Sequence, residues 1–165
     1  MDMHYRIAEL HDLPAIVSIY NSTIAGRMVT ADLEEISVES RLDWFQHHTE
    51  QRPLWVVEED ENILGWISLE PFYGRAAYHK TVEVSIYIHQ DARGKGLGRS
   101  MLQFVLDQAE ILDFKTVLGF VFGHNEPSIK LFERFGFKRW ADMPNVAELD
   151  GLERDLVILG KRIRP

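Results

Sequence analysis

The chain has 165 residues, of which 45% are hydrophobic and 27% charged, and its formal net charge is −8. This length suits one domain with a full core, so we expect residues 1–165 to form a single domain. An acidic chain lacks the basic face that attracts nucleic acid or anionic membranes, so we expect neither as a partner. The absence of cysteine excludes disulfides, thiolate nucleophiles, zinc–thiolate sites and iron–sulfur clusters.

The N-terminal residues carry charges throughout the stretch MDMHYRIAELHD, which therefore lacks the apolar core of a signal peptide. No apolar run approaches the roughly 18 residues that cross a bilayer. We expect a cytoplasmic protein.

The first third of the chain predicts one strand and two helices. Residues 5–10 suit a short strand, and Asp12 can cap a helix that has Pro14 in its first turn and runs to about residue 24. Residues 26–36 are expected to form a loop. Ser37 can cap a second helix, in which three apolar residues are spaced for burial: Val38, Leu42 and Phe45.

The middle of the chain is rich in β-branched and aromatic residues. Residues 54–58 and 63–72 are predicted strands, and the polar segment 59–62 between them predicts a hairpin turn. The acidic run there indicates a solvated turn and not a metal site, because hard cations need spaced ligands. Residues 73–80 are expected to form a loop before an apolar strand at 82–88.

The last part of the chain alternates helices with strands. We predict a helix over 97–112, a strand over 116–122, a short helix over 127–135, and strands over 137–141 and 155–159. The expected buried stripe of the first helix is Leu97, Met101, Val105, Ala109 and Leu112. The complete order predicts an α/β fold of the α+β type, with antiparallel strands first and a βαβ-like crossover later.

A glycine-rich turn separates the strand at 82–88 from the next helix. Gly94, Gly96 and Gly98 lie within five residues, which lets the backbone aim its N–H groups at one point beside a helix N-terminus. Such a turn is a phosphate-binding arrangement. The segment from His89 to Arg99 also has a charge of +2, from three cations against one carboxylate: Arg93, Lys95 and Arg99 against Asp91.

Two common phosphate-binding motifs also contain a glycine-rich turn between a strand and a helix. A P-loop needs four residues between its first Gly and a Gly-Lys-Ser/Thr, and a dinucleotide-binding fingerprint needs Gly-x-Gly-x-x-Gly; this turn matches neither. A solvated turn without a ligand is the remaining structural interpretation.

The pattern Arg93-x-x-Gly96-x-Gly98 after an apolar strand resembles the pyrophosphate-binding motif of the GNAT superfamily of N-acetyltransferases. The segment from Asn125-x-x-Ser128 to Gly136-Phe137 resembles a second motif of that family, and two N-terminal segments, 6–8 and 12–16, look like its first strand and helix. The resemblance implies acetyl-CoA as cosubstrate. It also implies a GNAT-like, strongly twisted mixed sheet of about six or seven strands with about four helices.

Within that superfamily, the segments 19–21 and 78–83 resemble the phosphinothricin/methionine sulfoximine acetyltransferase branch. This resemblance implies direct transfer of the acetyl group to the α-amine of a small amino-acid-like acceptor, and a homodimer. It places substrate contacts at Phe72, Arg75 and Tyr78, although a solvated arginine and packing aromatics would fit these positions equally.

The family resemblance assigns the cofactor contacts by position. The strand before the turn would pair with the pantetheine arm of CoA through Ile86, Tyr87 and Ile88. Asn125 would bond that arm or cap the helix that follows it. The pyrophosphate would lie on the loop backbone, assisted by its cationic side chains: Arg93, Gly94, Lys95, Gly96, Leu97, Gly98 and Arg99.

Glu83 is the candidate catalytic base. Strand alternation places residues 83, 85 and 87 on one face, one step from the residues expected to hold pantetheine. A partly apolar setting would raise the pKa of Glu83 toward neutrality, so that it can take the ammonium proton directly or through water. The alternative is a surface strand glutamate.

Two positions depart from the family pattern. Phe132 stands where many members carry a tyrosine that protonates the leaving thiolate, so water or another group must supply that proton. The branch has Gly-x-Trp-x-Asp before its last strand, and here Glu153 replaces the Trp. This change predicts a different or broader set of acceptor amines.

Metal and hydrolase chemistry are not expected. The seven histidines form no helix pair with ligand spacing: His4, His11, His47, His48, His79, His89 and His124. Ser68 and Ser85 lie in no Gly-x-Ser-x-Gly setting. The alternatives to the proposed chemistry are acetyl transfer to another amine (a protein N-terminus, a polyamine or an aminoglycoside), a CoA-binding sensor with weak catalysis, and a NAD-binding protein.

Overall fold

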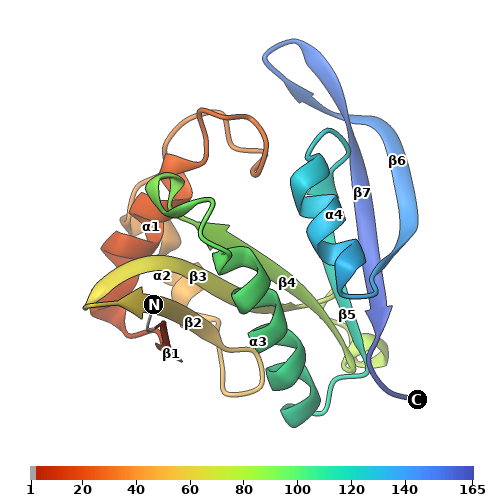
Figure 1. The fold of residues 1–165 in the computed structure, drawn as a ribbon, viewed down its shortest axis with the longest axis horizontal. Helices are drawn as coiled ribbons and strands as arrows, with labels where there is room; N and C mark the ends of the chain where they lie inside the picture. Colours follow the sequence, from red (N-terminus) through yellow and green to blue (C-terminus); the bar gives the residue numbers. More distant parts are fainter. Residues whose placement is uncertain (1–2) are drawn as a thin grey trace.

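The computed structural model describes residues 3–165, which form one mixed sheet with helices on both faces (Figure 1). The strands are β1 (His4–Ile7), β2 (Leu54–Glu59), β3 (Asn62–Pro71), β4 (Thr81–Ile88), β5 (Thr116–Phe122), β6 (Lys138–Leu149) and β7 (Leu152–Arg162). The α-helices are α1 (Leu13–Ser22), α2 (Leu42–Gln46), α3 (Leu97–Ile111) and α4 (Glu126–Arg134). The prediction of an α/β fold with a mixed sheet of about six or seven strands and about four helices is confirmed, since the sheet has seven strands and four α-helices flank it within residues 3–165.

The sheet has the strand order β1-β2-β3-β4-β5-β7-β6, and only β4 and β5 pair in parallel. Their pairing joins Thr81–Val84 to Thr116–Gly119 and then stops. The two strands diverge beyond that point (Figure 1). Ser85–Ile88 therefore keep β3 as a neighbour but have no strand on the β5 side. The sheet is split in its centre.

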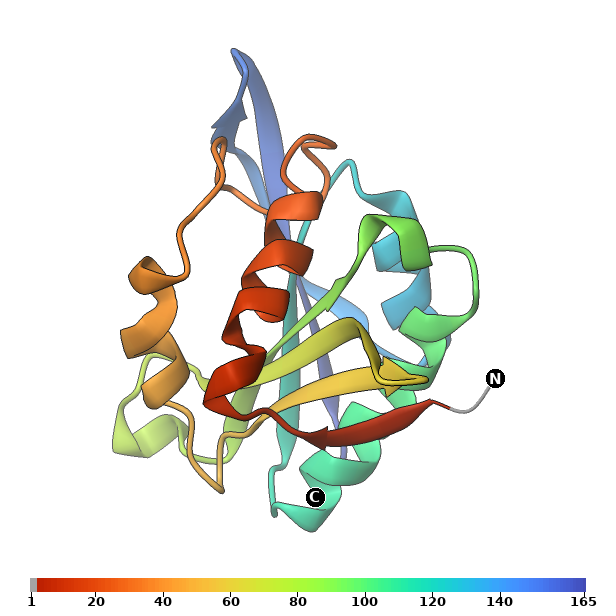
Figure 2. The same ribbon diagram turned by 90° about the vertical axis from the view of Figure 1, so that its left-hand side faces the viewer.

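The two faces of the sheet have separate cores. On one face, α3 packs Met101 and Val105 against Val84 and its neighbours, and α4 adds Ile129. On the other face, α1 packs against β2 and β3, with Ile16 among the buried side chains. Figure 2 shows α1 crossing in front of this face of the sheet. This second core covers the β2–β4 half, which carries residues 83, 85 and 87.

Local sequence signals account for most of the turns. The predicted β2–β3 turn is confirmed, with Asp60 and Glu61 both at positive φ, as a two-residue hairpin requires. The Ser37 Oγ accepts the Ser40 N–H at 3.2 Å, beside a 3₁₀ turn over Glu39–Arg41. The prediction that Ser37 caps the second helix is wrong, because α2 starts only at Leu42, with Arg41 at its N-cap and no side-chain cap. The burial predicted for Leu42 is wrong, because its side chain is 37% exposed.

The first strand is shorter than predicted and ends at Ile7. The chain then turns because the buried Asp12 carboxylate draws two groups to itself. Arg6 binds it through both terminal nitrogens, at 2.8 and 2.9 Å, and the Glu9 N–H donates to it at 2.7 Å. These bonds close a 3₁₀ turn over Leu10–Asp12, directly before α1.

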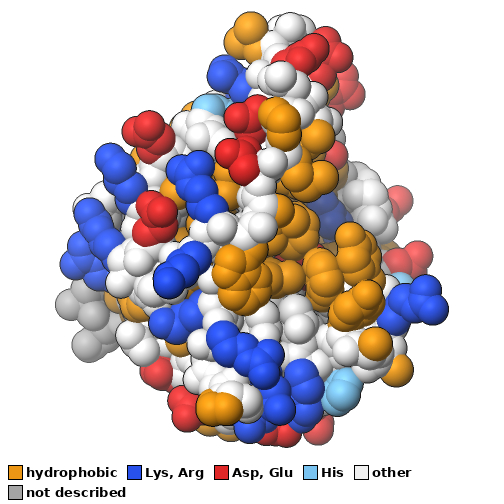
Figure 3. Space-filling model, turned by 90° about the vertical axis from the view of Figure 1, so that its right-hand side faces the viewer, with side chains coloured by type: hydrophobic (Ala, Val, Ile, Leu, Met, Phe, Trp, Pro, Cys, Tyr) orange, Lys and Arg blue, Asp and Glu red, His pale blue; other side chains and the backbone are white. Residues whose placement is uncertain are grey.

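The largest difference from the sequence-based expectation is the β6–β7 hairpin. Both strands are about twice as long as the predicted 137–141 and 155–159. Most β6 side chains are exposed, and a bulge follows Met143, so no period-two pattern marks the strand. Figure 3 shows the end of the hairpin protruding, with hydrophobic side chains gathered below it. Arg27 Nε bonds Asp150 Oδ2 at 2.6 Å and ties the hairpin tip to the loop after α1.

None of the helices within residues 3–165 has the length and apolar character needed to cross a membrane.

Candidate active site

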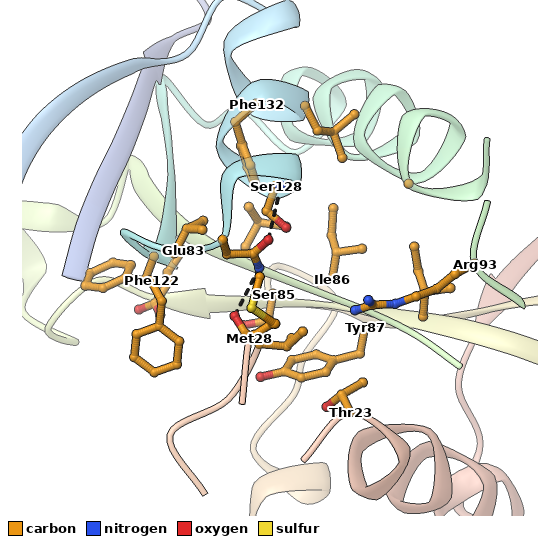
Figure 4. A pocket seen from close by; sticks show the side chains of 18 residues that line it. Thr23, Met28, Glu83, Ser85, Ile86, Tyr87, Arg93, Phe122, Ser128 and Phe132 are labelled. Carbon is orange, nitrogen blue, oxygen red and sulfur yellow. Dashed lines mark hydrogen bonds between the residues drawn. The ribbon is translucent and has the colours of Figure 1, made fainter. Parts of the chain in front are cut away.

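A cavity of about 250 Å³ occupies the split between β4 and β5 (Figure 4). Its walls come from both strands, from α4 and from the loop after α1. Glu83 lies toward one end and Arg93 toward the other. The side chains that line it are Thr23, Met28, Val29, Glu83, Val84, Ser85, Ile86, Tyr87, Ile88, Arg93, Gly98, Phe120, Val121, Phe122, Asn125, Ser128, Leu131 and Phe132.

The cavity continues into a second hollow of about 270 Å³ over the glycine-rich turn. The two hollows share seven lining residues: Met28, Ile88, Arg93, Gly98, Asn125, Ser128 and Leu131. Gly94, Gly96 and Leu97 line the second hollow alone. The hollows are therefore one elongated cleft that runs from Glu83 to the N-terminus of α3.

The predicted pantetheine residues Ile86, Tyr87 and Ile88 all line this cleft. They belong to the part of β4 that has no neighbour on the β5 side, so its outward N–H and C=O groups have no strand partner there. An extended ligand with amide groups binds such an edge as an added strand does. The amides of a pantetheine arm fit this edge.

The glycine-rich turn has the geometry of an anion site. Gly94 and Gly96 have φ of +79° and +75°, which other residues adopt only under strain, and Gly96 is the N-cap of α3. No side chain caps this helix, so the N–H groups of its first turn have no partner within it. Arg93, Lys95 and Arg99 are exposed, and no carboxylate in residues 3–165 lies within 4.0 Å of them. Phosphate groups fit these donors.

Substituting Gly96→Ala should weaken CoA binding about tenfold, because a β-carbon at positive φ costs roughly 1–2 kcal/mol and turns the loop N–H groups away. Titration calorimetry with CoA measures the change. Gly151→Ala is the matched control: Gly151 has φ +82° and open space around it in the β6–β7 turn, so it imposes similar strain away from the cleft. An equal loss of affinity in both variants would contradict a binding role for the loop.

Glu83 is half-buried at the inner end of the cleft, and this burial raises its pKa to about 7. The Glu70 carboxylate adds to the effect, because Glu70 is the directly paired residue on β3 and points to the same face. Glu83 therefore changes protonation near neutral pH. A carboxylate with this property can take a proton from an ammonium group and release it to water.

Asn125 lines the cleft, but its side chain is bonded within the protein. Its Oδ1 accepts the Ser128 N–H at 3.3 Å and its Nδ2 donates to the Met28 carbonyl at 3.0 Å, as the dashed lines in Figure 4 show. The predicted helix cap is confirmed. Asn125 also holds the loop after α1 against the cleft, together with His124, whose Nε2 lies 2.8 Å from the Arg27 carbonyl. Its contact with pantetheine stays a prediction.

Phe132 projects from α4 into the wall of the cleft (Figure 4). Its ring packs edge-on against Phe137, with centroids 4.9 Å apart, and it offers no proton. Glu153 is exposed near the start of β7 and pairs with Glu148 of β6. It does not line the cleft.

The three predicted acceptor contacts lie in the loop between β3 and β4 and do not line the cleft. The Phe72 ring contacts Tyr73 and Tyr78, with centroids 4.4 and 5.5 Å apart. Arg75 and Tyr78 are exposed. The assignment of these three residues as acceptor contacts stays a prediction.

The sequence-based assignment missed the loop after α1, which supplies Thr23, Met28 and Val29 to the cleft. It also missed Phe122 and Glu70. No local motif marks the loop residues, since the contact depends on Asn125, about a hundred positions later. For Glu70 a signal exists: it is a lone charge near the end of an apolar strand.

Within residues 3–165, no three His, Asp or Glu side chains are grouped as a metal site. Ser68 Oγ does lie 2.7 Å from His48 Nε2, but Ser68 is completely buried and has no access to a substrate.

A cleft with a free strand edge, a phosphate-type turn and a carboxylate that titrates near neutral pH fits a CoA-dependent acyltransferase. Comparison with known proteins agrees. The acetyltransferase (GNAT) family matches residues 16–137. A Bacillus subtilis protein named "Putative phosphinothricin acetyltransferase YwnH" is 54% identical over 98% of this chain and 99% of its own length.

A methionine sulfoximine/methionine sulfone acetyltransferase of Pseudomonas paraeruginosa is 29% identical over 100% of this chain and 97% of its own length. The crystal structure of a phosphinothricin acetyltransferase from Sinorhizobium meliloti in complex with acetyl-CoA superposes with a TM-score of 0.91 at 26% identity, covering 98% of this chain and 89% of that one. The chain belongs to the GNAT acetyltransferase family. It is an acetyl-CoA-dependent N-acetyltransferase.

Proposed function

We propose that the enzyme acetylates the α-amine of a small amino-acid-like acceptor of the phosphinothricin, methionine sulfoximine or methionine sulfone type. The observation that carries the proposal is Glu83, a half-buried carboxylate with a pKa of about 7 at the inner end of the cleft. The names of the relatives support this class of acceptor, since two of them match over nearly the whole chain.

Bound acetyl-CoA supplies the acetyl group as a thioester, and an amine attacks its carbonyl carbon while CoA leaves. The protein contributes position first. The turn from Arg93 to Arg99 would hold the pyrophosphate, and residues 86–88 would hold the pantetheine amides along the free edge of β4. A backbone N–H of this edge would also polarise the thioester carbonyl.

Glu83 accepts the proton that the acceptor amine must lose. An amino acid binds as its ammonium form, which is not a nucleophile, and the ionised Glu83 takes a proton from it directly or through water. The departing thiolate needs a proton in return. Phe132 cannot provide it, so we assign this proton to water or to another group in the cleft.

The contacts proposed for the acceptor are Glu83 and the loop between β3 and β4. Arg75 is exposed there and suits a bidentate bond to a substrate carboxylate. Phe72 and Tyr78 would form the wall beside it. This loop directly precedes β4, at the end of the strand where Glu83 lies.

We also propose that the enzyme is a homodimer. The β6–β7 hairpin exposes four large apolar side chains: Trp140, Met143, Val146 and Leu152. Trp140 has the largest of these side chains, and it is 52% exposed. Exposed apolar groups of this size suit a second copy of the chain. Sedimentation analysis of the wild type measures the association.

An acceptor panel tests the function. The protein is incubated with acetyl-CoA and, in turn, phosphinothricin, methionine sulfoximine and methionine sulfone, and the free thiol released is followed over time. We expect thiol release with at least one of them and none with N-acetylated acceptors. A peptide N-terminus, a polyamine and an aminoglycoside complete the panel, and transfer to these alone would contradict the proposed class.

Phe132 favours a second candidate, a CoA-binding sensor, because the wall of the cleft lacks the proton donor found in many relatives. A sensor would gain thermal stability from CoA yet release no thiol with any amine. The same panel, run beside a melting curve with and without CoA, separates the two candidates.

A further inference from the structure

A second carboxylate, Glu70, is paired with the proposed base across the sheet and is held by a small cluster of buried and half-buried side chains. Glu70 and Glu83 are register partners across β3 and β4 and share one face of the sheet. Side chains directly opposite in an antiparallel pair have β-carbons about 5 Å apart, and like charges in these positions repel. The sheet has another such pair, Glu148 and Glu153, but both of those side chains are exposed to solvent, whereas Glu70 and Glu83 are half-buried, where the repulsion is less screened.

The position of Glu70 is fixed. Trp44 of α2 donates its indole Nε1–H to Glu70 Oε1 at 2.6 Å, and Ser68 Oγ donates to the same oxygen at 3.5 Å. Ser68 is in turn bonded to His48 Nε2 at 2.7 Å. Trp44 is itself held by edge-on contacts with His48 and Trp66, at 4.8 and 5.3 Å between centroids. Trp44 and Ser68 thus hold the carboxylate directly, and His48 and Trp66 hold these two side chains in place.

No cation neutralises this pair. Within residues 3–165, neither Glu70 nor Glu83 has a Lys, Arg or His nitrogen within 4.0 Å. On the β5 side, the partner of Glu83 is the buried, apolar Leu118. The site therefore presents uncompensated negative charge where an ammonium acceptor is expected.

The other titratable groups of this face do not cancel that charge. Burial lowers the pKa of His48, which leaves it neutral at neutral pH, and burial raises the pKa of Tyr20 and Tyr87, which keep their protons. Arg41 stacks on Trp44 and Tyr20, with its guanidinium carbon 5.4 and 4.9 Å from the ring centroids. The remaining charged or titratable groups of the neighbouring elements are Asp32, Asp43, His47, Arg75, His79 and Lys80.

We propose that Glu70 is a positioning residue for acetyl transfer: fixed by Trp44, it acts through Glu83, keeping that carboxylate able to take the ammonium proton near neutral pH. The negative charge of the pair also attracts cationic acceptors. This role rests on the proposed function of Glu83 as the base.

The test compares Glu70→Gln with the wild type. The substitution removes the charge but keeps the side-chain size and an oxygen that can accept the Trp44 N–H. Without the neighbouring charge, Glu83 binds its proton less tightly, so the acidic limb of kcat/KM should move to lower pH by roughly half to one unit. Carbon-13 NMR titration of the Glu83 carboxyl should show the same shift without any substrate.

Three controls make the result specific. Glu148→Gln removes one charge from the exposed β6 strand and should leave both curves unchanged. Glu70→Gln in a Glu83→Gln background should produce no further shift of the pH profile. Trp44→Phe keeps the charge but releases the Glu70 side chain, and should shift the limb in the same direction by a smaller amount.

The outcomes separate this role from the proposed function. If the wild type is active and Glu70→Gln leaves both the acidic limb and the Glu83 titration in place, the role of Glu70 is overturned and the function stands. If no acceptor is acetylated, the proposed function fails, and the NMR titration still decides whether Glu70 controls the protonation of Glu83. A shift equal to that of Glu148→Gln also overturns the role.

Discussion

Replacing Glu83 with Gln is expected to lower kcat/KM about 10²- to 10⁴-fold at pH 8, the usual loss when a general base is removed. Glutamine has the same size but cannot accept the ammonium proton. The wild type should also lose activity as the pH falls through about 7, the pKa of Glu83, because only the ionised carboxylate acts as a base. The variant should lack this acidic limb.

The measurement is the rate of thiol release from pH 5.5 to 9, with CoA affinity determined separately. Glu83→Asp is the conservative control, since it keeps a carboxylate and should recover part of the rate and the acidic limb. A Glu83→Gln profile that still falls below pH 7 would remove Glu83 as the base.

The substitution Glu83→Gln should lower activity but raise the stability of the folded protein at pH 8. Because the pKa of Glu83 is higher in the folded protein than its ordinary value of 4.5, the folded state loses stability as the pH rises from about 4.5 through about 7. Glutamine avoids this loss. The melting temperature of Glu83→Gln should therefore exceed that of the wild type at pH 8 and match it at pH 4.5, which separates a catalytic defect from a folding defect.

Replacing Asp12 with Ala is expected to destabilise the protein by about 2–3 kcal/mol, since it leaves the Arg6 guanidinium without its main partner. Asp12 is 3% exposed and binds Arg6 by two hydrogen bonds. The value is at the lower end for a buried pair, because Arg6 is partly exposed and keeps Glu58 at 3.3 Å. Chemical denaturation at pH 7 measures the change.

The stability lost in Asp12→Ala should be smaller at low pH than at neutral pH. The Arg6 hydrogen bonds lower the pKa of Asp12 below its ordinary value of 3.8. The stability that Asp12 contributes is thus fully present above that value and disappears as the pH falls through the lower, folded-state pKa. Asp107→Ala, on the exposed surface of α3, is the control and should change stability by less than about 0.5 kcal/mol. Equal effects of the two substitutions would show that the Asp12 ion pair is not structural.

Much of the cleft could be predicted because its signals are local. The turn from Arg93 to Gly98 and the strand before it are contiguous, so strand, glycines and helix appear together in one stretch of sequence. Glu83 could be selected because the segment 78–83 resembles the family pattern, and alternation along the same strand then gives its face. The cap formed by Asn125 is equally local, since its partner is only three residues away.

What the sequence does not show depends on register and long-range contact. Glu70 becomes part of the site only through its pairing with Glu83, and nothing in the strand 62–71 alone specifies that pairing. The loop after α1 reaches the cleft through a bond from Asn125 to Met28, which are far apart in the chain. The length of β6 was missed because its side chains are exposed, so hydrogen bonds to β7 hold it and no buried face marks it.

The split in the sheet has a mechanical consequence. Within the sheet of residues 3–165, backbone pairing joins the β1–β4 block to the β5–β7–β6 block only through the short run from Thr81–Thr116 to Val84–Gly119. Backbone hydrogen bonds resist bending within each block far better than across so narrow a seam. Because β4 lines the cleft on one side and β5 and α4 line it on the other, a bound CoA would contact both blocks. Occupancy of the cleft is therefore expected to restrain their relative motion, and departure of CoA to relieve that restraint.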